Sequence, residues 1–209
     1  MKTTLGSLLT LSALLLALTA ANAESLVEGD AEAGKAKSIT CAACHGPEGN
    51  SANPLWPNLA GQHAAYLASQ LQAFKDSKRV NALMSSQAML LSEQDMANLA
   101  VYYEGMTPAV QAAADADLVA RGEALYRGGN KETGIAACMA CHGPSGKGNP
   151  ATQYPALGGQ HAAYTEKTLQ DYASGERKSV AGNNAMNEIA AKLSDEEIKA
   201  LAAYLQGLH

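Results

Sequence analysis

The sequence predicts an all-α protein built from two tandem helical domains. Its 209 residues are enough for one or two domains, and landmark segments occur twice in the same order. Residues 61–66 (GQHAAY), for example, return as residues 159–164, 98 positions later. Apolar residues recur at helical spacing, and no sustained alternation of apolar and polar residues predicts a strand. Each copy has the size of a small domain.

The first 23 residues are predicted to be a signal peptide that directs export to the periplasm. Lys2 precedes an uncharged apolar run over residues 5–18, and residues 21–23 (ANA) have the small-x-small form that signal peptidase cuts. This run is shorter than the about 20 apolar residues that a transmembrane helix needs. Cleavage is therefore expected near Ala23, with an uncleaved N-terminal anchor as the alternative. No later stretch is apolar enough to cross a membrane.

The two copies are expected to occupy residues 24–110 and 111–209. The join falls near residues 107–117, where Pro108 follows the last helix of the first copy. In each copy, one helix is predicted after the GQHAAY segment, and another follows a Ser-x-x-acid capping signature. The capping signatures are Ser92 with Asp95 and Ser194 with Glu197. The apolar stripes are Leu67, Leu71 and Phe74, then Met96, Leu99, Ala100 and Tyr103, and in the second copy Thr165, Leu169 and Tyr172, then Ile198, Leu201, Ala202 and Leu205.

Charge and composition argue against nucleic acid as a partner and indicate a small core. With 15 basic and 20 acidic residues, the formal net charge is −5. This balance argues against nucleic-acid binding, because phosphate binding needs clustered Lys and Arg. Aromatic residues make up only 5% of the chain, and residues 46–57 and 143–155 are loops rich in Gly, Pro and Asn. A domain of this size and composition gains stability from an internal staple or a prosthetic group.

All four cysteines lie in two Cys-x-x-Cys-His motifs, at residues 41–45 and 138–142. Two thiols three positions apart on a helical turn can each add to one vinyl group of a haem, and the adjacent histidine then becomes a ligand of the iron. We therefore expect two haem c groups, one in each copy. The predicted attachment residues are Cys41, Cys44, Cys138 and Cys141, and the predicted iron ligands beside them are His45 and His142.

Three other uses of the cysteines are less consistent with their spacing. A zinc site built from two such pairs usually has them closer together, whereas 93 residues separate Cys44 from Cys138. A thioredoxin-like redox pair needs a βαβ context, which the sequence lacks. Disulfides are common in exported proteins, but they do not explain a histidine directly after each pair.

These features together resemble the dihaem cytochrome c4 family. The resemblance rests on an exported, duplicated, helical chain with two Cys-x-x-Cys-His-Gly motifs and two GQHAAY segments, and it extends to residues 206–209 (QGLH). It implies two class I c-type cytochrome domains, each wrapped around one haem, with His/Met ligation of both irons. It also implies a soluble electron carrier between a membrane quinol-oxidising complex and a terminal oxidase.

Met84 and Met186 are the predicted second ligands of the two irons. Each lies eight residues before the capping serine of the late helix, whereas Met89 lies three residues before it. Met89 therefore remains an alternative in the first copy. Met96 falls on an apolar stripe and is predicted to pack in the core. The cytochrome c4 resemblance implies the same pair, Met84 and Met186.

His63 and His161 are rival ligands that would give bis-His ligation. Their position directly after Gly-Gln, at the start of a predicted helix, instead favours a helix-start or surface role. An iron-bound imidazole usually donates its other N–H to a backbone carbonyl, and Pro57 and Pro155 are the candidates for that acceptor.

Trp56 and Tyr154, which precede the two prolines, have two possible roles. Each can donate a hydrogen bond to a haem propionate or pack within its loop.

One-electron transfer is the predicted function, with no catalytic residues. A methionine ligand favours ferrous iron and raises the reduction potential above that of a bis-His haem. A dihaem peroxidase or a sulfur-compound dehydrogenase is the rival class, but catalysis needs an exchangeable ligand position with acid, base or cysteine groups nearby. A gas or redox sensor would need a signalling domain, which the sequence lacks.

The expected partners are redox proteins, namely the quinol-oxidising complex and the terminal oxidase. The acidic surplus suits a basic docking face on the partner, with an encounter that weakens as salt rises. Peripheral association with the membrane is left open.

Overall fold

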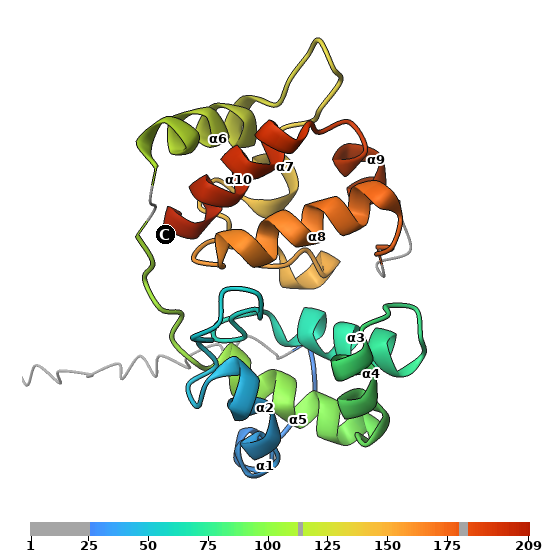
Figure 1. Cartoon of the computed structure of the whole chain (residues 1–209). Coiled ribbons are helices and arrows are strands. Elements are labelled where there is room, and N and C mark those ends of the chain that lie inside the picture. Colours follow the sequence, from blue (N-terminus) through green and yellow to red (C-terminus); the bar gives the residue numbers. More distant parts are fainter. Residues whose placement is uncertain (1–25, 113–114, 180–183) are drawn as a thin grey trace, which may run out of the picture.

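The computed structural model describes residues 26–112, 115–179 and 184–209. The predicted signal peptide, residues 1–23, and two residues of the predicted join, 113 and 114, lie outside these ranges. The described residues form helices joined by loops, with two isolated β-bridges and no strand among them. The all-α prediction is confirmed. Figure 1 shows two helical units stacked one above the other and joined by a single extended segment.

The first unit contains five helices in chain order. Helix α5 is its centre, because α1 crosses it on one side and α3 packs against it on another. The core between these helices is made of small and medium side chains, among them Ala64, Leu67, Leu99 and Ala100. The helices are α1 (Ala31–Lys37), α2 (Ile39–His45), α3 (Ala64–Lys75), α4 (Ala82–Met89) and α5 (Glu93–Glu104).

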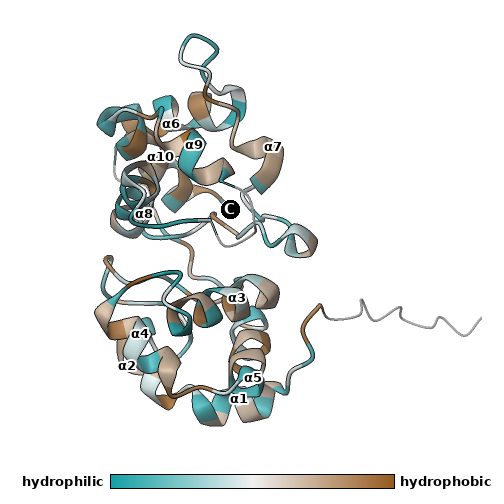
Figure 2. Cartoon of the chain, turned by 90° about the vertical axis from the view of Figure 1, so that its right-hand side faces the viewer, coloured by the Kyte–Doolittle hydropathy of each residue, from teal (hydrophilic) through white to brown (hydrophobic). Residues whose placement is uncertain are grey.

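The second unit repeats this order around α10, which packs against α6 and α8. Its core contains two tyrosines, Tyr126 and Tyr204, beside Ile198, Leu201 and Leu205. The elements are α6 (Ala116–Gly128), α7 (Met139–His142), the 3₁₀ turn η1 (Pro150–Thr152), α8 (Ala162–Ser174), α9 (Ala185–Ala190) and α10 (Asp195–Gly207). The short helix α7 is coloured as hydrophobic over most of its length in Figure 2.

Both late helices begin with the predicted capping boxes. The Ser92 hydroxyl accepts a hydrogen bond from the Asp95 backbone N–H, and the Asp95 carboxylate accepts from the Ser92 backbone N–H. Ser194 and Glu197 make the same reciprocal pair at the start of α10. These bonds satisfy N–H groups that a helix start would otherwise leave unpaired. None of the helices within the described ranges has the length and apolar character that crossing a membrane requires.

Two helix pairs approach closely because a glycine faces a backbone carbonyl. A Cβ atom at Gly34 would clash with the Asn98 carbonyl oxygen where α1 crosses α5, and one at Gly122 would clash with the Ala200 carbonyl oxygen where α6 crosses α10. The two contacts occupy equivalent places in the repeat. They bring the first and last helices of each unit together over the same core.

Replacing Gly122 with Ala is expected to lower the free energy of unfolding by about 1–3 kcal/mol, because α6 and α10 must separate to admit the methyl group. Thermal unfolding of the intact protein followed by circular dichroism measures this loss. Gly128→Ala is the matched control, since no atom lies within 4 Å of its added Cβ and both residues belong to α6. Equal stability of the two variants would contradict the close-approach argument.

Candidate functional site

Each Cys-x-x-Cys-His motif forms the end of a short helix. Cys41, Cys44 and His45 lie on α2, whereas Cys138 is the N-cap of α7 and Cys141 lies within it. The spacing of three places both thiols of a pair on one helical turn. The four thiols are free, so they form no disulfides. Within the described residues no group of three or more His, Cys, Asp or Glu side chains is arranged to hold a metal ion.

The two motif histidines are buried and oriented in the same way. The Nδ1 atom of His45 lies 2.9 Å from the Pro57 carbonyl oxygen, and Nδ1 of His142 lies 3.0 Å from that of Pro155. Because a carbonyl oxygen can only accept, Nδ1 carries the proton in each ring, and Nε2 keeps its lone pair. The predicted role of the two prolines as acceptors is confirmed. When the ring is neutral, this hydrogen bond therefore selects the tautomer in which Nε2 is available to a metal.

Burial also sets the protonation state of these groups. It lowers the pKa of His45 and of His142, and the hydrogen bonds to the proline carbonyls oppose that change only in part. Burial raises the pKa of Cys41, and it raises the pKa of Cys138 to about 11. At neutral pH these thiols are protonated. Neutral thiols beside a neutral imidazole are the groups that thioether attachment and axial ligation of a haem require.

The aromatic residues before the prolines differ between the units. The ring of Tyr154 lies 6.0 Å from that of His142, centroid to centroid, at an interplanar angle of 45°. Trp56 is half-buried in the equivalent loop. These positions are compatible with packing and with a hydrogen bond to a propionate.

The candidate methionines differ in how exposed their side chains are to solvent. Met84 is half-buried in the first turn of α4, whereas Met89, at the end of the same helix, is 62% exposed. Met186 lies on α9 and packs against the core of the second unit. Met96 is 2% exposed on α5, so its predicted place in the core is confirmed. Met84 and Met186 therefore have partly sheltered side chains on equivalent helices.

His63 and His161 are the N-cap residues of α3 and α8, as a helix-start role predicts. Their rings reach across to the other unit. Nε2 of His63 lies 2.6 Å from the Lys147 carbonyl oxygen, and Nε2 of His161 lies 2.9 Å from that of Ser51. These contacts occupy the ring nitrogens that bis-His ligation would need.

The neighbouring glutamines form a crossed pair of contacts between the units. The Gln62 side chain donates to the Ala156 carbonyl oxygen (2.9 Å) and accepts from the Ala156 N–H (2.8 Å). The Gln160 side chain makes the same two bonds with Asn58, at 3.0 and 2.9 Å. The sequence indicated a repeated landmark and a helix start at GQHAAY, but the role of this segment in the junction was not predicted. The sequence feature that could have indicated the junction is a polar Gln-His pair, repeated without change at the start of two helices.

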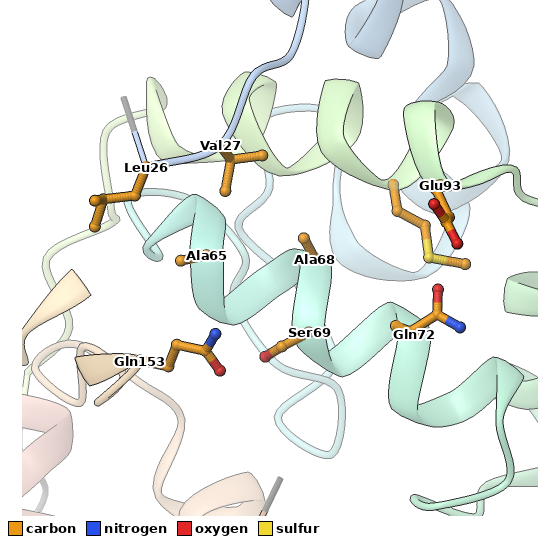
Figure 3. Close-up of a pocket in the computed structure, with 9 residues that line it drawn as sticks. Leu26, Val27, Ala65, Ala68, Ser69, Gln72, Glu93 and Gln153 are labelled. Carbon is orange, nitrogen blue, oxygen red and sulfur yellow. The ribbon is translucent and has the colours of Figure 1, made fainter. Parts of the chain in front are cut away.

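The pocket drawn in Figure 3 lies beside α3 and holds none of the motif residues. Its lining is mostly apolar or uncharged, and Glu93 is its one titratable residue among those described. Gln153, from the second unit, closes one side of it. This pocket is therefore separate from the motif residues on α2 and α7.

Comparison with known proteins agrees with this geometry. The family model described as Cytochrome c matches residues 31–107 and again residues 119–209. Cytochrome c4 of Azotobacter vinelandii is 46% identical over 190 residues, which cover 87% of this chain and 90% of that protein. The chain belongs to the cytochrome c4 family. Family membership confirms the fold of two cytochrome c domains and indicates covalently bound haem c and electron transfer.

Two further relatives extend the comparison. The crystal structure of reduced recombinant cytochrome c4 from Pseudomonas stutzeri is similar, with a TM-score of 0.83 and 44% sequence identity. The match covers 87% of this chain and 100% of the crystallised chain. A protein named thiosulfate dehydrogenase electron acceptor, from Thiomonas intermedia, is 38% identical over 81% of this chain and 78% of its own. The arrangement of two units in this chain is thus shared with cytochrome c4.

Replacing both Gln62 and Gln160 with Ala is expected to loosen the junction, because it removes the four hydrogen bonds that these side chains make between the units, worth about 0.5–1.5 kcal/mol each. Calorimetry of the wild-type protein should show a single unfolding transition. In the double variant this transition should split or broaden, because the units lose their coupling. Gln72→Ala is the control, since the Gln72 side chain is bonded only within its own unit, to Asp76. An unchanged, single transition in the double variant would argue against a structural role for these bonds.

Proposed function

We propose that this chain carries two covalently bound haem c groups and passes single electrons between redox proteins. Cys41 and Cys44 would anchor one haem in the domain spanning residues 24–110. Cys138 and Cys141 would anchor the other in the domain spanning residues 111–209. The observation that supports this most directly is the pair of buried, neutral histidines, each beside two free thiols and each with Nδ1 bonded to a proline carbonyl.

The residues fit such a group in the chemistry of the atoms they offer. His45 and His142 would each bind iron through Nε2, which the hydrogen bond at Nδ1 leaves free. Met84, on α4, and Met186, on α9, would each supply a second ligand to one iron. In the view of Figure 1, α2 and α4 lie on different sides of the first unit. A haem would also fill cores that otherwise contain few large side chains.

The haem iron supplies the exchange between ferric and ferrous states when it is bound. The protein fixes the residues that would hold the haem: backbone carbonyls bind the histidine rings, and Asn81 caps α4 by accepting from the Met84 N–H at 3.0 Å. Methionine sulfur favours the ferrous state and so raises the potential relative to two histidines. The crossed glutamines hold the two units together, so that an electron can enter through one and leave through the other.

The proposed partners are a membrane quinol-oxidising complex and terminal oxidases or other acceptors, with the protein exported to the periplasm after cleavage near Ala23. Peripheral association with a membrane is compatible with this role. The relative named as an electron acceptor of thiosulfate dehydrogenase supports a carrier role rather than catalysis. In this proposal every cysteine is used for attachment and each iron has two protein ligands, which leaves no open site for an enzyme.

Met84→Ala and Met186→Ala are each expected to remove about half of the near-infrared methionine–iron charge-transfer absorption of the oxidised protein, because each removes one of two sulfur ligands. Met89→Ala is the matched control and should keep the full band, since Met89 is 62% exposed. A full band in Met84→Ala together with a diminished band in Met89→Ala would reverse the assignment in the first domain.

Mass spectrometry of the exported protein is expected to give the mass of residues 24–209 plus two haem groups. Cys138→Ser combined with Cys141→Ser should remove one haem, because both thioether bonds of the second domain are then lost. The first domain serves as the internal control and should keep its haem. A wild-type protein with no added mass would overturn the proposed function.

A further inference from the structure

Helix α4 of the first unit leaves large apolar side chains exposed to solvent. Val80, Leu83, Met89 and Leu90 are between 62 and 77% exposed, and we call these four residues the α4 surface. Leu83 and Leu90 are seven positions apart, which places them about two turns from each other on one face of the helix. Val80 precedes the helix, and Met89 is its last residue. Exposed apolar side chains therefore occur at both ends of α4.

The packing of α4 leaves this surface uncovered. The main helical neighbour of α4 is α3, and the residue that α4 buries is Ala88. Leu83 and Leu90 therefore add nothing to the core of the first unit. Large apolar side chains that gather on one exposed face are typical of a surface that binds another molecule, because burying them is favourable.

No charged residue interrupts this surface, since residues 80–92 contain no Asp, Glu, Lys or Arg. The basic residues just before it already have partners within the chain. Lys75 donates to a backbone carbonyl, and Lys78 pairs with a carboxylate at 3.3 Å. Arg79 donates to the Gln70 side chain at 2.8 Å. Binding to the α4 surface would therefore come mainly from apolar contact and little from attraction between charges.

The second unit does not repeat this surface. At the offset of 102 that relates the two proposed methionine ligands, Ala185 stands in place of Leu83 and Lys192 in place of Leu90. Glu188, which is exposed on α9, adds a second charge. The two units therefore present different faces at equivalent helices, and only the first presents an apolar one.

The α4 surface lies on the helix that carries a proposed iron ligand. Met84 is half-buried in the first turn of α4, and Leu83 directly precedes it. A molecule that covers Leu83 and Leu90 would be separated from Met84 only by the helix itself. Electron exchange through this surface would therefore involve the haem of the first domain.

The small size of the surface favours a transient partner. A helix of eight residues is about 12 Å long. Stable complexes bury about 800 Å² on each partner, which is more than four side chains on so short a helix can provide. Encounters between redox proteins bury less area and release quickly. The area thus fits a redox protein better than a stably bound second copy of this chain.

We propose that the α4 surface is the docking site through which the first domain exchanges electrons with a redox protein whose own docking face is apolar and uncharged. This inference rests on the proposed function. One electron leaves the reduced protein of the pair and enters the oxidised one, and no bond forms or breaks. Docking at this site depends only weakly on salt, and the second domain, which lacks the surface, can serve a different partner.

Leu83→Lys and Leu83→Glu in the protein with both haems test this proposal. Stopped-flow absorbance measures the rate constant of electron transfer with the purified quinol-oxidising complex and with the purified terminal oxidase. With at least one of them, both variants should lower the rate constant about tenfold, because either charge would lose its water in an apolar contact. Val110→Lys and Val110→Glu are matched controls and should keep the wild-type rate, since Val110 is 79% exposed in the segment that joins the units.

Two results would overturn the proposal. Unchanged rates with both complexes would show that the surface is not used. Opposite changes in the Lys and Glu variants would show that net charge, and not apolar contact, guides docking. Leu90→Lys and Leu90→Glu give a second pair six positions from Met84, in case Leu83 variants alter the near-infrared band. The same loss of rate is expected for this pair, and wild-type rates would count against the proposal.

Other occupants of the surface would give different results. A second copy would make the wild-type protein sediment as a dimer and Leu83→Glu as a monomer. A membrane would make the wild-type protein, but not Leu83→Glu, co-sediment with vesicles of phosphatidylglycerol and phosphatidylcholine. Either result would overturn a redox protein as the occupant. We expect monomers in both proteins and equal behaviour with vesicles.

The failure of this inference and that of the proposed function are distinguishable. Wild-type protein that carries two haems, together with Leu83 and Leu90 variants that keep wild-type rates, would contradict only the docking site. Wild-type protein without haem would contradict the proposed function itself.

Discussion

The hydrogen bond from a buried histidine to a proline carbonyl is the contact on which the candidate site depends. It fixes the tautomer of the imidazole, and burial lowers the pKa of each ring, which favours its neutral form. The loop must reverse directly after the histidine for this bond to form. Gly46 and Gly143 allow that reversal, because they end α2 and α7 with φ values of 80° and 76°. Local backbone geometry thus sets the direction of a potential metal ligand.

The same loops also join the two units. Asn58 and Ala156 directly follow Pro57 and Pro155, and they are the residues whose backbone groups the crossed glutamines bind. The carbonyl that orients each histidine is therefore one residue from a bond to the other unit. Movement at the junction would displace the acceptors of both histidines, so a rigid junction and well-oriented ligands support each other. An electron carrier benefits from both, since little rearrangement should accompany the change of charge.

Local and repeated patterns explain most of what the sequence could predict. Both capping boxes, the core position of Met96 and the proline acceptors depend on short-range spacing, which the duplication provides twice. The junction was missed because it depends on how two folded copies face each other, which helical periodicity does not contain. The choice between Met84 and Met89 shows the same limit. The two methionines lie five positions apart on one helix, and only the packing of α4 leaves Met84 half-buried and Met89 exposed.

The two copies are not interchangeable at the point where they meet. Tyr66 and Tyr164 match in the repeat, as do Arg79 and Arg177, but Thr168 stands where the first copy has Gln70. A threonine is too short to bridge two guanidinium groups, so the one bridging acceptor comes from the first unit. Arg177 consequently depends on Tyr66 and Gln70 of the other unit for its described side-chain hydrogen bonds. The second unit therefore contributes a buried charge that it does not itself neutralise, and docking of the two units is what gives that charge its partners.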